Sequence, residues 1–148
     1  SLEQVKTNQA QIRARALEAG FKFHPDGRKR VYNTFNSHRL LYWAANECDL
    51  EKQATLKKEL LNTYFVLAVS LDDEKNVLDA VVRAGLDKAR AAEILASDEF
   101  TAEVKAEEEF YKNLGIQSVP SLILNEEYLL QGAQEPESLI SAFEQLIK

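Results

Sequence analysis

One cysteine and two histidines are the most chemically versatile side chains of this 148-residue chain. Cys48 stands alone, so the chain can form neither an internal disulfide nor a Cys-x-x-Cys redox pair. It falls on the apolar side of a predicted helix, so we expect an inert, buried thiol. His24 and His38 have no carboxylate at a recognised metal-binding spacing. We therefore expect no metal and no other cofactor.

A Val-Pro pair carries the most informative local signal. Ile116–Pro120 leads directly into a short apolar run. Proline has no amide hydrogen for a β-ladder, so it belongs at the start or edge of a strand. A cis bond is also much less costly before proline than before any other residue. The residues alone leave two readings open, a cis Val119–Pro120 bond and an ordinary trans proline at a strand boundary.

The elements that must position this pair form the last third of the chain. Ser121–Leu124 and Tyr128–Gln131 are short apolar runs separated by Asn125–Glu127, a pattern typical of an antiparallel hairpin. Their apolar character predicts strands buried on both faces. Pro136 fits the first turn of a final amphipathic helix.

Six helices are predicted upstream of the hairpin, from apolar residues at helical spacing. The first spans Leu2–Ala19 and ends at Gly20, where a left-handed C-terminal cap belongs. Tyr42 and Trp43 of the second helix are expected to pack in the core or between domains rather than to stack on a ligand. The predicted N-terminal caps of the second to sixth helices are, in order, Asn33 or Thr34, Asp49, a residue of Ser70–Asp73, Asp87 and Ser97.

Charge and hydropathy narrow the classes of partner. The chain has 18 Lys and Arg against 24 Asp and Glu, a net charge of −6, which disfavours a nucleic-acid binder. Arg28–Arg30 is a short basic run, expected to be a solvated loop rather than an anion site. No apolar run approaches the roughly 18 residues that a membrane span needs. Ser1–Lys6 lacks the pattern of a secretory signal.

Two separated motifs carry a family resemblance. Leu114–Pro120, followed by Gln131–Gln134, resembles the closing section of the DsbA family, especially its FrnE-like branch. In that branch, a motif similar to Asn33–Leu41 opens a helical domain inserted into the thioredoxin fold. The resemblance implies an α/β chain, a partial thioredoxin fold with a large helical insertion. The implied divisions are an N-terminal helix and connector over 1–32, the helical insertion over 33–97 and the C-terminal half of the thioredoxin fold over 98–148.

The resemblance also implies a function, protein thiol–disulfide exchange. In the family, the first strand and the helix with the Cys-x-x-Cys pair precede everything seen here, so we expect this chain to be inactive alone. The implied partner is a protein or small molecule that contains a thiol or a disulfide, and the implied location is cytoplasmic. The residues that the resemblance places in substrate binding are Ser118, Val119, Pro120, Asn33, Asn36, His38 and Arg39.

Two other functions remain open. Kappa-class glutathione transferases and 2-hydroxychromene-2-carboxylate isomerases look similar but use a serine and bind glutathione. Their counterpart of Gly132–Gln134 carries an acidic and a basic residue, whereas this stretch has no arginine, so this reading ranks second. The third is a non-enzymatic helical binding module. A two-stranded sheet leaves unpaired edges, so we also expect a homodimer through the exposed edge.

Overall fold

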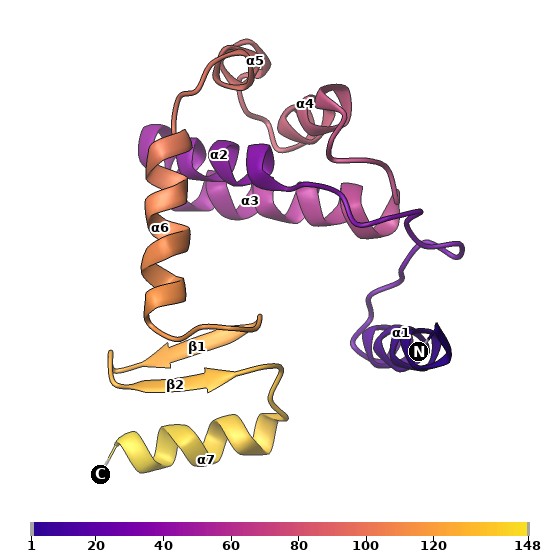
Figure 1. The fold of residues 1–148 in the computed structure, drawn as a ribbon, viewed down its shortest axis with the longest axis vertical. Helices are drawn as coiled ribbons and strands as arrows, with labels where there is room; N and C mark the ends of the chain where they lie inside the picture. The colour runs from indigo at the N-terminus through magenta and orange to yellow at the C-terminus, as the bar shows by residue number, and fades with distance from the viewer. Residues whose placement is uncertain (1, 148) are drawn as a thin grey trace. The chain divides into compact units, whose positions relative to one another are not determined.

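The chain forms two compact units, described here by a computed structural model of residues 2–147. The units are Ser1–Val104 and Lys105–Lys148, and their boundary falls within a helix. Figure 1 shows the order of the elements along the chain. They are α1 (Leu2–Glu18), α2 (Phe35–Trp43), η1 (Ala44–Cys48), α3 (Leu50–Leu61), η2 (Asn62–Val66), α4 (Glu74–Arg83), α5 (Lys88–Ala96), α6 (Thr101–Asn113), β1 (Ser121–Leu124), β2 (Tyr128–Gln131) and α7 (Pro136–Leu146), where η denotes a π-helical turn.

Helix α1 ends as its sequence predicts. Gly20 has a φ of 80°, and its N–H donates to Leu17 O at 3.0 Å while Phe21 N–H donates to Ala16 O at 2.7 Å. This pair of bonds satisfies carbonyls that the last turn leaves without a helical partner. The chain can therefore leave α1 at a sharp angle and enter the loop that follows.

Four helices enclose the core of the N-terminal unit. Helix α2 contacts α3 and α5, and α4 contacts the same two helices (Figure 1). Three predicted aspartate caps are confirmed, at Asp49, Asp73 and Asp87, each of which accepts a backbone N–H of the first turn that follows. The buried core consists of Tyr32, Leu40, Trp43, Ala44, Leu56, Leu60, Leu71, Val77, Leu78, Ala80, Val81, Ala84, Ala91 and Ile94.

The predicted burial of Cys48 is wrong. Cys48 is exposed because it is the last residue of η1, immediately before Asp49, whose backbone is extended. The helix ends there and no neighbouring element covers the thiol. Trp43, by contrast, is 2% exposed, and its indole N–H donates to Glu47 Oε2 at 3.0 Å. The prediction of a packing role for Trp43 is confirmed.

The predicted start of the sixth helix is also wrong. Ser97 caps the end of α5 instead, since its hydroxyl donates to Ile94 O and accepts the N–H of Glu99. Phe100 then has a φ of 60°, outside the helical region, and α6 begins only at Thr101. Asp98 and Glu99 therefore belong to the loop before α6.

The predicted hairpin and final helix are confirmed in the C-terminal unit. β1 and β2 are antiparallel, with Leu122 opposite Leu130, and Pro136 occupies the first turn of α7. The predicted burial of both strand faces is wrong within this chain, because Leu122 is 43% and Ile123 is 40% exposed. No residue of the described range 105–147 is buried. A two-stranded sheet and two short helices do not supply enough surface to cover its apolar side chains.

None of the helices within residues 2–147 is long and apolar enough to cross a membrane.

Candidate substrate-binding site

The loop before β1 is held in place by three hydrogen bonds. Gln117 N–H donates to Gln131 Oε1 at 3.0 Å, and Ser121 Oγ donates to Ser118 O at 2.7 Å. Pro120 O accepts Gly132 N–H at 2.8 Å, which extends the β1–β2 ladder by one bond. The Val119–Pro120 peptide bond is cis. The hairpin therefore fixes the backbone on both sides of Val119.

Val119 itself is open to solvent. Its side chain is 87% exposed. Within residues 2–147, neither its N–H nor its C=O has a hydrogen-bond partner. Backbone groups left open at the start of an edge strand can accept an extended chain by strand addition. The loop therefore presents an unpaired backbone N–H and C=O at the start of β1.

Three further predicted site residues lie at the start of α2. Asn33 donates its N–H to Asp72 Oδ1 at 2.7 Å, and its side-chain oxygen accepts Phe35 N–H at 2.9 Å. Asn36 is exposed, and its Oδ1 accepts a hydrogen bond from Arg39. His38 is exposed, and its imidazole contacts no other described residue through a hydrogen bond or ion pair. Asn33 thus orients the entry to α2, while the His38 imidazole is free to meet a ligand.

Arg39 is buried and fully used by the fold. It is 4% exposed. Its Nε donates to Glu99 O at 2.9 Å, and its Nη2 donates to Ser97 O at 2.7 Å and to Ile94 O. These carbonyls lie at the end of α5 and in the loop to α6, where helical partners are absent. Arg39 therefore clamps this turn onto α2, a role its position in the motif does not reveal.

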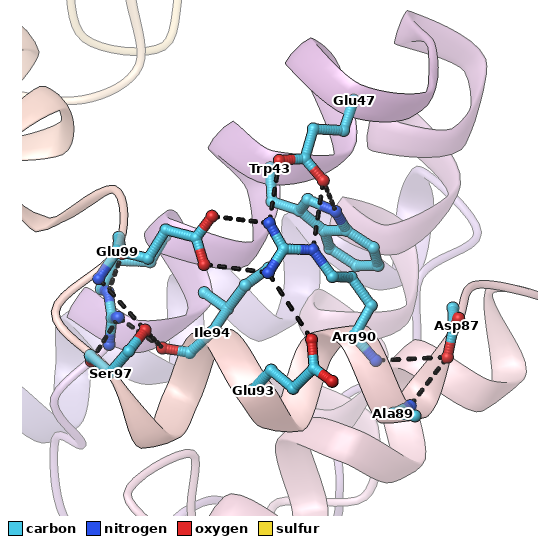
Figure 2. Close-up of polar contacts among 10 residues, drawn as sticks. Trp43, Glu47, Asp87, Ala89, Arg90, Glu93, Ile94, Ser97 and Glu99 are labelled. Carbon is cyan, nitrogen blue, oxygen red and sulfur yellow. Dashed lines mark hydrogen bonds and ion pairs between the residues drawn. The ribbon is translucent and has the colours of Figure 1, made fainter.

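A second arginine ties the same turn to η1. Arg90 binds Glu99 in a bidentate pair, with N–O distances of 2.6 and 2.9 Å, and also reaches Glu47 at 2.9 Å (Figure 2). The hydrogen bonds that Arg90 donates to Glu99 and Glu47 raise the pKa of Arg90, and the bond that Glu99 accepts from Arg90 lowers the pKa of Glu99. Figure 2 also shows the hydrogen bond that the Trp43 indole N–H donates to the Glu47 carboxylate. The network involves residues far apart in sequence, so no local pattern predicts it.

The seven predicted site residues fall into two groups. Ser118–Pro120 belong to the C-terminal unit, and Asn33, Asn36, His38 and Arg39 belong to the N-terminal unit. Each group is ordered locally by the contacts described above. Among the residues that the structure describes, no three His, Cys, Asp or Glu side chains are arranged to hold a metal ion.

Comparisons with known proteins agree on one family. The sequence model of the DSBA-like thioredoxin domain matches residues 1–144. The crystal structure of a probable DsbA oxidoreductase from Streptomyces coelicolor is similar, with 28% identity and a TM-score of 0.84 over 98% of this chain. The chain spans 61% of the length of that protein. No curated protein sequence matches. The predicted α/β class, with a helical insertion in a thioredoxin-like fold, is confirmed.

Proposed function

Because the chain belongs to the DSBA-like thioredoxin domain family, we propose that it is part of a protein thiol–disulfide oxidoreductase of the FrnE-like branch. Its substrate is a protein or small molecule that contains a thiol or a disulfide. Its place of action is the cytoplasm. The observation that carries the proposal is the open backbone of Val119 at the start of β1.

The chemistry of thiol–disulfide exchange determines which step this chain can contribute to. In disulfide exchange, a thiolate attacks one sulfur of a disulfide, a mixed disulfide forms, and the other sulfur leaves as a thiolate. A second thiol must then resolve the mixed disulfide. With one cysteine, this chain holds no dithiol of its own, so it binds substrate for a Cys-x-x-Cys pair that it does not contain and is inactive alone.

Substrate binding in this proposal has two parts. The loop Ser118–Pro120 holds an extended segment of substrate, with Val119 N–H donating to a substrate carbonyl and Val119 C=O accepting a substrate amide. Asn33, Asn36 and His38 supply exposed polar contacts. Arg39 acts as a positioning residue, because its donors hold α2 against the turn between α5 and α6.

The glutathione-dependent alternative gains no support from 132–135. Gln134 Nε2 donates to Gln131 O and to Gly132 O, so its amide serves the local loop. No cation stands in this stretch to pair with a glutathione carboxylate. The redox proposal is therefore preferred.

A peptide titration tests the loop Ser118–Pro120 as a docking edge. An extended peptide with one alkylated cysteine is added to the ¹⁵N-labelled chain, and amide shifts are followed by NMR. We expect saturable shifts at 117–122, and no such shifts with the same peptide N-methylated at every backbone amide, which has no amide donor on either edge and cannot pair as a strand. Equal shifts from both peptides, or shifts confined to other segments, would refute strand addition.

An activity assay tests the absence of a dithiol. The chain and its Cys48→Ser variant are both expected to give no faster reduction of insulin disulfides than the reductant alone. Turnover by the chain that Cys48→Ser abolishes would contradict the proposal, because it would assign the chemistry to Cys48.

A further inference from the structure

A half-open groove lies between α1, the loop over residues 22–31 and η2. Its volume is about 510 Å³. Its apolar lining comes from Ile12 of α1 and from the rings of Phe23, Tyr64 and Phe65. The polar lining comes mainly from the basic run that the sequence analysis expects to be only a solvated loop. None of these residues takes part in the proposed docking edge, so the groove is considered independently of the redox proposal.

Specific contacts hold the groove open. His24 N–H donates to Phe65 O at 3.0 Å, which ties the loop to η2. The rings of Phe23 and Phe65 meet edge to face at 5.4 Å. On the other wall, Arg13 Nη1 donates to Pro25 O at 2.7 Å. The lining is therefore positioned by contacts of the fold rather than by a loose loop.

Gly27 allows the close approach of α1. Its φ is 66°, and a Cβ at this position would lie 2.6 Å from Arg13 Nη2. Only glycine combines this backbone with that contact at low cost. The guanidinium of Arg13 consequently lies against the turn and faces the groove.

The groove is strongly cationic in an acidic chain. Four cations line it, Arg13, Arg28, Lys29 and Arg30, against one carboxylate, Asp26. Arg30 is paired with Asp72 at 2.6 Å. Within residues 2–147, Arg28 and Lys29 have no carboxylate partner. Two positive charges of this groove therefore have no carboxylate counterpart among the described residues.

Arg28 is oriented by an aromatic ring. Its guanidinium carbon lies 4.6 Å from the centre of the Tyr64 ring and 5.6 Å from that of Phe65. A guanidinium held over a ring retains its N–H donors for a carboxylate or a phosphate. No described residue accepts a hydrogen bond from these donors. Arg28 is thus held in place beside an apolar surface, with N–H donors available to bind an anion.

We propose that the groove binds a small organic anion, one that joins a carboxylate or a phosphate to a flat apolar body. Arg28 and Lys29 bind the anionic group, with Arg13 beside them, and the apolar body packs on Phe23 and Tyr64. The volume lies within the range of about 300 to 1,000 Å³ that is usual for small-molecule sites. An acidic protein surface would need a contact area of roughly 800 Å² on each side, so the small ligand is the better fit.

The test uses 1-naphthyl phosphate as the probe, with binding measured by calorimetry at low salt. One saturable site is expected, together with NMR shifts at the amides of Gly27, Arg28 and Phe65. Inorganic phosphate and 1-naphthol, each of which lacks half of the probe, should bind at least about tenfold more weakly. Higher salt should weaken the binding of the probe.

Two matched variants localise the charge. Arg28→Gln should weaken binding at least about tenfold, whereas Lys57→Gln, at an exposed lysine of α3, should leave it unchanged. Both residues are exposed, so thermal unfolding should confirm that both variants fold. Equal affinities of the two variants, equal affinities of 1-naphthol and 1-naphthyl phosphate, or shifts only outside the groove would overturn the proposal. An acidic peptide that competes with the probe more strongly than simple carboxylates would also overturn it.

Discussion

Arg39 is a buried cation whose partners are all backbone or amide oxygens. Three of them, Glu99 O, Ser97 O and Ile94 O, belong to the turn between α5 and α6, where Ile94 O also accepts from Ser97 but Arg39 is the donor that reaches Ser97 O and Glu99 O. Because a buried acceptor without a partner is costly, the side chain stabilises the fold chiefly by preventing that cost. At the residue scale, the motif that resembles a substrate site thus also contains a structural clamp.

The first prediction concerns Arg39→Met. Methionine keeps much of the length of the side chain but removes the donors to Glu99 O and Ser97 O, so we expect a loss of about 2–4 kcal/mol in the free energy of unfolding. Urea denaturation measures this loss. His38→Gln, at the adjacent exposed residue, should change stability by less than about 0.5 kcal/mol. Similar values for both variants would show that the clamp contributes little.

The second prediction concerns pH and the Arg90–Glu99 pair. The hydrogen bond from Arg90 lowers the pKa of Glu99 in the folded chain. The carboxylate therefore favours the folded state above the ordinary pKa of 4.5, and this contribution is lost as the pH falls through the lowered folded value. Glu99→Gln should lower the Tm at pH 7, and the difference from the unmodified chain should shrink as the pH falls below 4.5 and through the lowered folded pKa of Glu99.

The matched control for that pair is Glu103→Gln. Glu103 is exposed on α6, so its variant should follow the pH dependence of the unmodified chain. If the effect of Glu99→Gln on Tm were the same at pH 7 and at low pH, the carboxylate would not be the source of the stabilisation.

At the scale of elements, short-range chemistry decides where helices begin. Asp49 accepts Lys52 N–H at 2.6 Å and starts α3 at the position its sequence predicts. Ser97 has the same capping chemistry, yet its hydroxyl serves the end of α5 instead. Arg39 also donates to Ser97 O, and Phe100 has a φ of 60°, so the turn after Ser97 is not helical and α6 begins at Thr101. A capping residue in the sequence therefore predicts a helix start only where the residues that follow it are free to become helical.

The third prediction tests the cap of α3. Asp49→Ala should cost about 1 kcal/mol in the free energy of unfolding, because the N–H of Lys52 loses its acceptor. Asp49→Asn keeps an acceptor and should recover most of that loss. Urea denaturation compares the two variants, and equal destabilisation by both would show that the carboxylate charge, rather than capping, is responsible.

The features that the sequence predicts correctly are those that depend on residues close together along the chain. The hairpin, the helix after Pro136 and the aspartate caps depend on neighbours within a few positions, and all are confirmed. The Arg90 network and the groove around Arg28 depend on contacts between residues far apart along the chain. One signal for Arg39 was present, since it lies four positions before the buried Trp43 and so shares its helix face.

On the scale of the whole molecule, the two units differ in how well they cover their apolar residues. The N-terminal unit has a buried core, whereas residues 105–147 contain no buried side chain. Leu122, Ile123 and Phe143 are each at least 40% exposed. Exposed apolar strands with unpaired edges favour association with another chain or segment.

The fourth prediction is that the chain forms a dimer through β1 and its edge. Light scattering over a range of concentrations should show a reversible monomer–dimer equilibrium. Leu122→Lys should shift the equilibrium towards monomer, because a charge on an edge strand opposes its pairing with a second chain. Glu127→Lys, in the loop between the strands, should leave the equilibrium unchanged. A monodisperse monomer at about 100 μM, a concentration at which an interface of micromolar affinity is occupied, would contradict this prediction.

Amide hydrogen exchange at Val119 is the most direct test of the account. The N–H of Val119 has no partner within residues 2–147, whereas the N–H of Gly132 already donates to Pro120 O. A bound extended peptide should therefore slow exchange at Val119 and leave Gly132 little changed. If the peptide binds and exchange at Val119 remains as fast as in the free chain, this loop is not the docking edge.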